Sequence, residues 1–382
     1  MRRLWRAERI FDGTTIHHGR ALLTEGGHVL GLSDDTPDET PDETIDEQIT
    51  LGPGILAPGF LDLQVNGGGG ALLGQGDPDA ALATICATHG RLGSTGVMPT
   101  LITSSEAVML DVVEAARRAT VDALPGFLGL HLEGPFLDPA RKGAHDAALI
   151  RPMQDRDLAM LIEAARDLTA LMVTLAPENA SRDQIAALAA AGVVVSLGHS
   201  NAPEAVARDA IAAGATCATH LYNAMSPLGH REPGLVGAVL DGEIWAGIIP
   251  DGIHVAPGPF RLALRAKPGR MFAVSDAMAV AGTDRPEFML NGRRIERRNG
   301  RLTLSDGTLA GADISLPHAL RWMVQIAGIG LAEALAMMTS VPAQALELER
   351  YGTLNAGASA DLVLINDDFT LGGVWRAGEP ID

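Results

Sequence analysis

The chain of 382 residues lacks several features that whole classes of protein require. Its only cysteines, Cys86 and Cys217, lie far apart and outside any Cys-x-x-Cys motif. This excludes a disulfide framework and a thiolate zinc site, and it favours a reducing compartment. Asp and Glu outnumber Lys and Arg by 47 to 29, and the basic residues form no stripe, so a nucleic-acid partner is not expected. An anionic substrate would need a local basic pocket.

Long apolar runs are also missing. The longest ones fall short of the roughly 18 residues that a membrane helix requires. After the first residues, Arg6, Glu8 and Arg9 interrupt any apolar stretch, so no signal-peptide core is expected. Hydrophobic residues still make up 47% of the chain and charged residues 20%, which is typical of a globular protein with a sizeable core. We therefore expect a soluble, cytoplasmic protein without a membrane partner.

Short strands are predicted at both ends of the chain. Residues 22–31 and 47–56 show short apolar segments broken by Gly and Pro, and the pattern returns after Leu348 in YGTLNAGASADLVLIN. These segments predict one small β-sandwich domain, built from residues 1–56 and 346–382. The acidic repeat PDETPDET at residues 37–44 is interpreted as a solvated hairpin tip.

The region between these ends, residues 57–345, has a different pattern. Short apolar runs alternate with Ala-rich amphipathic stretches at the spacing of βα units, which predicts a parallel sheet. The candidate strands are residues 59–65, 97–101, 127–132, 171–175, 193–197, 216–221, 245–249 and 272–275. Eight such units in series predict an α/β fold, a (β/α)8 TIM-type barrel that forms the catalytic domain.

Polar motifs stand at the ends of these predicted strands, in HLEGP, LGHS, THLYNA, PDGIH and SDAM. In a closed barrel the carboxyl ends of the strands converge. Glu133, His199 and His220 would then hold a divalent cation and leave one coordination position open for water, as in a catalytic site. A single histidine is more often a hydrogen-bonded core residue, but the joint placement at strand ends favours metal binding.

Asp276 in SDAM lies where a carboxylate could act as a proton shuttle. The alternative is a helix cap for the following segment. The run of four glycines at residues 67–70 lacks the Lys and Ser or Thr of a phosphate-binding loop, and it predicts a close-approach loop at the barrel mouth.

With these residues in view, the chain resembles the N-acetylglucosamine-6-phosphate deacetylases of the amidohydrolase superfamily. The resemblance runs from about Leu56 to Asp361 through APGFLDLQVNG, HLEGPF, RKGAH, LGHS, THLYNAM, HREPGLVGA, DGIH, SDAM and GTLAGA in unbroken order. The most specific pair is HLEGPF with RKGAH. The ending TSVPAQALEL with ADLVLIN is similar to the wider superfamily and supports the fold alone.

The resemblance implies a role for each matching residue. Metal ligands would be Glu133, His199 and His220, and the catalytic residues would be Asp276 as acid/base and His145, which would also contact the substrate and steady the oxyanion. The substrate-binding residues would further include Asn223, Ala224, Arg231 and His254 around the phosphate. The family also implies a homodimer in which residues near Arg231 and His254 contribute across the interface. A plain surface ion pair is the alternative for Arg231.

Many amidohydrolases have His-x-His at the end of the first barrel strand, whereas this chain has Gln64, Val65 and Asn66 there. Two imidazole ligands are therefore missing, and no strand-end Lys is placed to bridge two ions, so we expect one divalent ion per subunit. Zn is the first expectation, while Fe, Mn and Co also accept this ligand set. Further contacts to the substrate or to the ligands are expected from Gln64, Asn66, His131 and Leu309.

The expected reaction is hydrolytic deacetylation of a small amino-sugar phosphate, N-acetyl-D-glucosamine 6-phosphate, by a metal-activated water. The nearest alternative is the galactosamine epimer, because the orientation of one hydroxyl depends on loop contacts that no motif exposes. Two further candidates are a non-catalytic sugar-phosphate sensor and an amidohydrolase that acts on a ring amide or peptide. All the acid/base and metal groups are present, which counts against the sensor, and the phosphate-binding motifs count against a ring amide or peptide as substrate.

Overall fold

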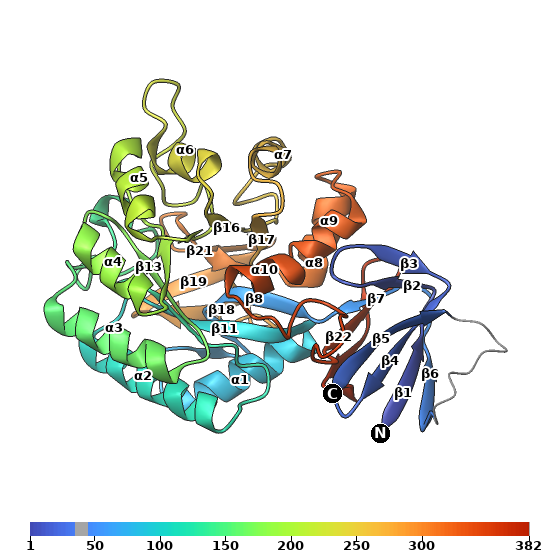
Figure 1. The fold of residues 1–382 in the computed structure, drawn as a ribbon. Coiled ribbons are helices and arrows are strands. Elements are labelled where there is room, and N and C mark those ends of the chain that lie inside the picture. The colour runs from blue at the N-terminus through green and yellow to red at the C-terminus, as the bar shows by residue number, and fades with distance from the viewer. Residues whose placement is uncertain (35–44, 382) are drawn as a thin grey trace.

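The computed structural model describes residues 1–34 and 45–381. Figure 1 shows a barrel of strands wrapped by helices, with a smaller β region at one side that contains both chain termini. The acidic segment interpreted as a hairpin tip, residues 37–44, lies outside the described residues. None of the helices in the described ranges combines the length and the apolar character that crossing a bilayer requires.

The predicted (β/α)8 barrel is confirmed. Its eight-stranded sheet follows the order of the chain, and neighbouring strands are parallel throughout. Each strand overlaps one of the predicted segments. The strands are β8 (Phe60–Val65), β11 (Ser94–Ile102), β12 (Leu130–Glu133), β13 (Leu171–Leu175), β14 (Val194–Leu197), β15 (Cys217–Ala218), β16 (Trp245–Ile248) and β17 (Met271–Ala273).

Amphipathic helices cover the outside of the barrel. In the second of them, Met109, Val112 and Ala116 face the core at helical spacing, and Ser105 caps the first turn by accepting a hydrogen bond from the amide of Val108. The helices are α1 (Pro78–Arg91), α2 (Glu106–Val121), α3 (Asp155–Asp167), α4 (Arg182–Ala190), α5 (Glu204–Ala213), α6 (Gly234–Asp241), α7 (Pro257–Ala266), α8 (Leu316–Gln325), α9 (Leu331–Ala336) and α10 (Ser340–Ala345).

The first and last barrel strands, β8 and β17, do not form a continuous ladder with each other. Near the carboxyl ends the seam is closed by a bridge between Val65 and Ala277, and by Asp62, whose carboxylate accepts the amide of Ser275 at 3.1 Å. Lower down, the amide of Leu61 donates to the carbonyl of Met338 at 2.8 Å. At this seam the buried Asp62 side chain and the segment after α9 therefore supply the hydrogen-bond partners that a neighbouring strand would supply in a regular ladder.

Both chain ends contribute to the smaller β region, as predicted. One sheet has the order β5-β4-β1-β6 and the other β24-β23-β22-β7-β2-β3. Trp5, Leu22, Leu56 and Leu362 form a shared buried cluster between them. The strands are β1 (Arg2–Arg6), β2 (Arg9–Phe11), β3 (Ile16–His18), β4 (Arg20–Glu25), β5 (His28–Asp34), β6 (Glu47–Thr50), β7 (Ile55–Pro58), β22 (Leu362–Ile365), β23 (Leu371–Arg376) and β24 (Glu379–Pro380). The domain boundaries at residues 56 and 346 stay a prediction.

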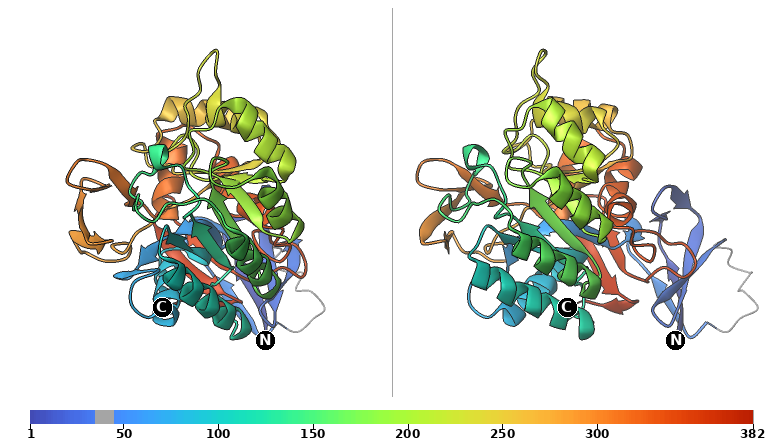
Figure 2. Two further views of the ribbon diagram at one scale, coloured as in Figure 1. Left: turned by 90° about the vertical axis from the view of Figure 1, so that its left-hand side faces the viewer. Right: turned by 60° about the vertical axis from the view of Figure 1, so that its left-hand side comes forward.

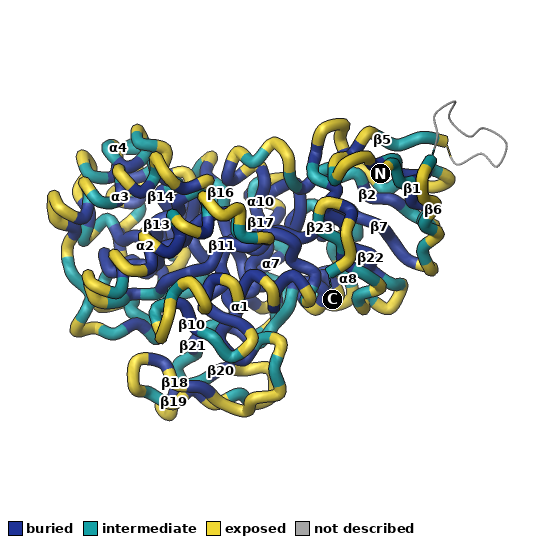
Figure 3. Tube along the Cα trace, turned by 90° about the horizontal axis from the view of Figure 1, so that it is seen from below, coloured by how far each residue is buried: buried dark blue, intermediate teal, exposed yellow. Residues whose placement is uncertain are grey.

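A four-stranded antiparallel sheet, which the sequence analysis did not predict, is inserted between β17 and α8. It consists of β18 (Glu287–Leu290), β19 (Arg293–Arg298), β20 (Arg301–Thr303) and β21 (Leu309–Ala312). Figures 2 and 3 show it standing out from the barrel. Its tight turns carry Asn-Gly pairs, in which Asn291 and Asn299 have φ of 49° and 51°. This dipeptide is the strongest local signal for a hairpin, and it could have revealed the insertion.

Candidate active site

The predicted polar residues meet at the carboxyl ends of the barrel strands. Glu133 is the last residue of β12, and His199, His220 and Asp276 follow β14, β15 and β17. The last three have φ of 47°, 31° and 47°, in the left-handed region that residues with a Cβ rarely adopt. Such backbone strain persists only where the surrounding structure holds it, and it gathers at functional sites. The sharp turns after these strands place all four side chains in the barrel mouth.

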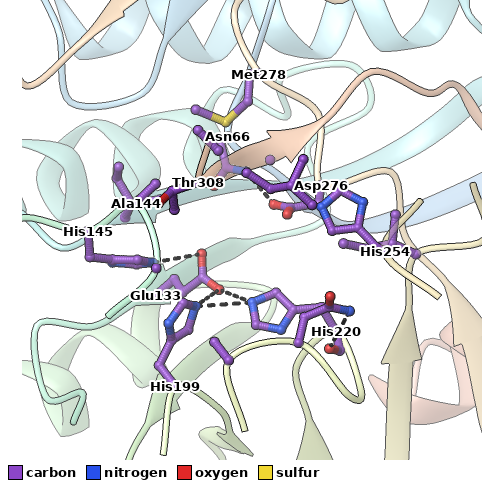
Figure 4. Close-up of a pocket in the computed structure, with 18 of the residues that line it drawn as sticks. Asn66, Glu133, Ala144, His145, His199, His220, His254, Asp276, Met278 and Thr308 are labelled. Atoms are coloured by element: carbon purple, nitrogen blue, oxygen red, sulfur yellow. Dashed lines mark hydrogen bonds and ion pairs between the residues drawn. The ribbon is translucent and has the colours of Figure 1, made fainter. Parts of the chain in front are cut away.

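Glu133, His199 and His220 form the tightest cluster (Figure 4). Glu133 Oε1 lies 3.0 Å from His220 Nε2 and 3.4 Å from His199 Nε2, and the two imidazole nitrogens are 3.1 Å apart. A tetrahedral ion bound at about 2.1 Å separates its ligand atoms by about 3.4 Å. The three atoms therefore have the spacing of ligands around one ion.

The hydrogen bonds of the cluster agree with metal binding. His199 Nδ1 lies 2.8 Å from the carbonyl oxygen of Arg141 and can only donate to it, so a neutral ring would present the lone pair of Nε2 to an ion. His220 Nδ1 is buried without a partner among the described residues. Burial alone would raise the pKa of Glu133, but hydrogen bonds from His199 and His220 outweigh it and hold that pKa well below its ordinary value. Glu133 is therefore an anionic carboxylate. The donor set fits one divalent cation.

His145 lies at the other oxygen of the same carboxylate. Its Nε2 is 3.8 Å from Glu133 Oε2, and its ligand atoms also fall within 4.8 Å of those of Glu133 and His199. Glu133, His199 and His220, whose atoms are closer together, are the set that could hold one ion. His145 Nδ1 lies 2.8 Å from Thr103 Oγ1 and accepts the amide of Thr103 at 3.3 Å, and a nitrogen that accepts both would place the proton of a neutral ring on Nε2. Burial and then the charge of His199 lower the pKa of His145 to about 3, so the ring is a neutral donor.

Asp276 faces this cluster from the opposite strand end. Asn66 Nδ2 donates to its Oδ1 at 2.7 Å, and Gln64 Nε2 lies 3.2 Å from the same oxygen and 3.1 Å from Glu133 Oε1. The Gln64 amide thus bridges the two carboxylates, and the Asn66 amide donates to Asp276 alone. Burial, followed by the charge of Glu133, raises the pKa of Asp276 to about 6. A carboxyl group with a pKa near neutrality can both accept and return a proton.

A cavity of about 520 Å³ opens in front of these groups, a size that suits a small-molecule ligand. Among the predicted substrate-binding residues, His145, Asn223, Ala224, His254 and Leu309 line it, and so does Asn66. The inserted sheet supplies one wall, which sequence reasoning missed. Its contributions are Leu290, Gly307, Thr308, Leu309, Ala310 and Gly311. Arg141, a cationic residue that lines the cavity from the same loop as His145, was also missed, although RKGAH contains it.

His254 is fixed by a neighbouring carboxylate. Its Nδ1 lies 2.6 Å from Asp251 Oδ2, and Asp251 also accepts the amides of Ile253 and His254. Burial would raise the pKa of Asp251, but the hydrogen bond from His254 outweighs it and lowers that pKa. Because Asp251 occupies Nδ1, the other ring nitrogen is the one available to a ligand.

Gln64 does not itself line the cavity, and two further predicted residues lie away from it. Arg231 is exposed on the loop between β15 and α6, which projects from the body of the chain (Figures 1 and 2), and it does not line the cavity of its own chain. His131 is buried inside the barrel, where its Nε2 lies 2.7 Å from Thr174 Oγ1 and its Nδ1 lies 3.2 Å from Thr100 Oγ1. Burial lowers the pKa of His131 to about 4, so this ring is neutral.

A parallel barrel whose strand ends converge on a buried carboxylate and two imidazoles, with an open cavity before them, defines a metal-dependent barrel hydrolase. Comparison with known proteins gives the family. The model of the amidohydrolase family matches residues 55–381, and the chain belongs to this family.

Individual relatives cover most of the chain. It is 37% identical over 328 residues to N-acetylgalactosamine-6-phosphate deacetylase from Shewanella sp. (strain ANA-3), covering 85% of this chain and 83% of the relative. It is 35% identical over 331 residues to N-acetylglucosamine-6-phosphate deacetylase from Haemophilus influenzae, covering 84% of this chain and 86% of the relative. The crystal structure of N-acetylglucosamine-6-phosphate deacetylase from Pasteurella multocida superposes with a TM-score of 0.95 at 35% identity, over 100% of this chain and 99% of that one.

Proposed function

We propose that this protein hydrolyses the acetamide of N-acetyl-D-glucosamine 6-phosphate and releases D-glucosamine 6-phosphate and acetate. One observation carries the proposal. Glu133, His199, His220 and Asp276 meet in one cavity, which Asn223 and His254 also line. The relatives named as deacetylases of amino-sugar phosphates support the choice of substrate.

Glu133, His199 and His220 would hold one divalent ion per subunit, with Zn as the first expectation and Fe, Mn or Co as alternatives. When bound, such an ion polarises a carbonyl group and lowers the pKa of water to roughly 7. Gln64 and Asn66 stand where a second ion would require imidazoles. Their amide nitrogens donate hydrogen bonds to carboxylates and offer no lone pair to an ion. The proposal is therefore a single-ion site.

Asp276 is the proposed general acid/base. In its ionised form it takes a proton from the water that adds to the acetamide carbon. It then returns a proton to the nitrogen as the C–N bond breaks, so that acetate and a free amine leave. Both protons of the water are accounted for: one reaches the amine nitrogen through Asp276, and the other leaves the new carboxyl group as acetate forms and protonates the released amine or the solvent.

His145 is the proposed oxyanion donor. Its neutral ring would carry the proton on Nε2, which lies 3.8 Å from Glu133 Oε2. A fixed neutral donor stabilises the charge that develops on the carbonyl oxygen as water adds. Because the pKa of His145 is lowered to about 3, the ring keeps this form throughout the physiological range.

The phosphate is proposed to lie at the part of the cavity lined by Asn223, Ala224 and His254. Leu309 would pack against the sugar from the inserted sheet. Arg231 would supply its charge to the cavity of a second subunit in a homodimer, because its loop projects from the body of the chain and Arg231 does not line the cavity of its own chain. A cytoplasmic location stays a prediction from the sequence.

The galactosamine epimer is the second candidate substrate, because a relative at 37% identity carries that name. The test is acetate release from the 6-phosphates of N-acetylglucosamine and N-acetylgalactosamine, each with Zn, Fe, Mn or Co added back to metal-free protein. We expect a higher kcat/KM for the glucosamine derivative. A higher kcat/KM for the galactosamine derivative would make it the preferred substrate. Acetate release from neither sugar would refute the proposed deacetylation.

A further inference from the structure

Arg141 lies at the cavity wall but takes no part in the reaction steps proposed above. It ends the short 3-10 helix η1 (Pro139–Arg141), in the loop between β12 and α3, and it lines the 520 Å³ cavity. Its Nε donates to Asn201 Oδ1 at 2.9 Å. Within the described part of the chain, its terminal nitrogens form no hydrogen bond and no carboxylate pairs with it. The guanidinium therefore keeps an unneutralised charge at the cavity wall.

Asn201 ties this guanidinium to a particular edge of the cavity. Asn201 follows Ser200, whose amide donates to the carbonyl of Ala224 at 3.1 Å, and Ser200 forms a parallel bridge with Met225. Asn223 and Ala224 line the cavity along the same edge. The Arg141 side chain is thus anchored beside the residues proposed to receive the phosphate.

The acidic groups around the cavity would repel a phosphate unless a cation is present beside it. Glu133 and Asp276 are carboxyl groups in the cavity, and the chain carries a net charge of -18. Asp251 offsets any positive charge on His254. Among the residues described as lining the cavity, Arg141 is the one Lys or Arg. A guanidinium can bind a phosphate through two parallel hydrogen bonds, which a point charge cannot reproduce.

We infer that Arg141 is a further substrate-binding residue: its guanidinium binds the phosphate of a substrate in the cavity of its own chain. This inference rests on the proposed function. The backbone of Arg141 also orients a proposed metal ligand, since its carbonyl accepts the proton of His199 Nδ1. Substitution of the side chain leaves that carbonyl in place. The two contributions of Arg141 can therefore be separated by experiment.

The experiment compares R141Q with wild type, using N-acetylglucosamine 6-phosphate and unphosphorylated N-acetylglucosamine as substrates. For the phosphorylated substrate we expect kcat/KM to fall about 10- to 100-fold, mainly through KM, because a hydrogen bond to a charged group is lost. For the unphosphorylated substrate the change should stay below about threefold, and bound metal should equal that of wild type. R141K should recover part of the loss.

The matched control is K142Q, which removes the adjacent charge from a side chain that does not line the cavity. It should keep the wild-type preference for the phosphorylated substrate. An unchanged preference in R141Q, or an equal loss on both substrates, would overturn the inference, because either result means that the guanidinium does not recognise phosphate.

Calorimetric titration of the holoenzyme with inorganic phosphate separates this inference from the proposed function. If wild type releases no acetate from the phosphorylated substrate, the proposed function fails. Arg141 is then still tested, since R141Q should bind phosphate about tenfold more weakly than wild type and K142Q. Equal binding by all three proteins would refute the role of Arg141 by itself.

Discussion

The amide Nδ2 of Asn66 donates a 2.7 Å hydrogen bond to Oδ1 of Asp276. The bond joins the residue after the first barrel strand to the residue that follows the last one, across the seam of the barrel. It favours the ionised form of Asp276, whereas burial and the charge of Glu133 favour the protonated form and raise its pKa to about 6. The pH at which Asp276 becomes a base is therefore set partly by Asn66.

This relationship predicts the pH dependence of kcat/KM. Asp276 must be ionised to accept a proton, so kcat/KM should be constant above pH about 6 and fall below it. Asn66→Ala removes a donor that lowers the pKa, so the acid limb should move to higher pH. Profiles between pH 5 and 8 measure the shift. A limb that stays in place or moves to lower pH would contradict the assignment.

Asp276→Asn should abolish turnover. The amide keeps the size of the side chain but cannot take a proton, and general acid/base catalysis contributes about 10²- to 10⁴-fold. Acetate release measures the loss, and elemental analysis should find the wild-type amount of metal, since Asp276 is not a proposed ligand. Activity within about tenfold of wild type would show that another group moves the proton.

Removal of metal by a chelator should abolish activity and lower the melting temperature. The ligand atoms of Glu133, His199 and His220 lie 3.0 to 3.4 Å apart and fit one ion, and an ion that binds only the folded state stabilises it. Titration back with Zn, Fe, Mn or Co should restore activity at one ion per chain. Saturation at two ions per chain, after loose ions are removed, would contradict the single-ion site.

Mixed dimers test whether Arg231 acts in the partner's cavity. R231Q and D276N homodimers should each be nearly inactive. In a mixed dimer, one cavity combines an intact Asp276 with the Arg231 of the other subunit, so random mixing should restore about a quarter of wild-type activity. Mixed samples that stay inactive would indicate that Arg231 acts within its own chain, and a monomeric protein would exclude the arrangement.

Asp62 predicts a pH dependence of stability. Burial raises the pKa of this carboxyl group to about 7 from an ordinary 3.8. A raised pKa means that the folded state holds the proton more tightly, so this contribution to stability is present below pH 3.8 and is lost as the pH rises through about 7. Asp62→Asn stays neutral and still offers an oxygen to Ser275. The free energy of unfolding of the variant, relative to wild type, should increase between pH 4 and 7 by up to about 4 kcal/mol. Urea denaturation at several pH values measures it, and a pH-independent difference would refute the raised pKa.

The sequence by itself determined the barrel and the composition of its mouth. Strand runs and amphipathic stretches alternate at βα spacing, and a parallel barrel brings the carboxyl ends of its strands together whatever the loops do. Glu133, His199, His220 and Asp276 each follow an apolar run, so their convergence could be predicted from order alone. The structure places all four in one cavity.

Tertiary structure alone decided the walls of the cavity and the state of its groups. The inserted sheet and Arg141 reach the cavity through contacts between segments far apart in the chain, such as Arg141 with Asn201, and no local pattern encodes such a contact. The pKa of Asp276 likewise depends on burial and on Glu133 and Asn66, which only the folded chain brings near it. Sequence periodicity predicts which face of a helix or strand is buried. The contacts of each polar side chain depend on packing between segments that are distant in the sequence.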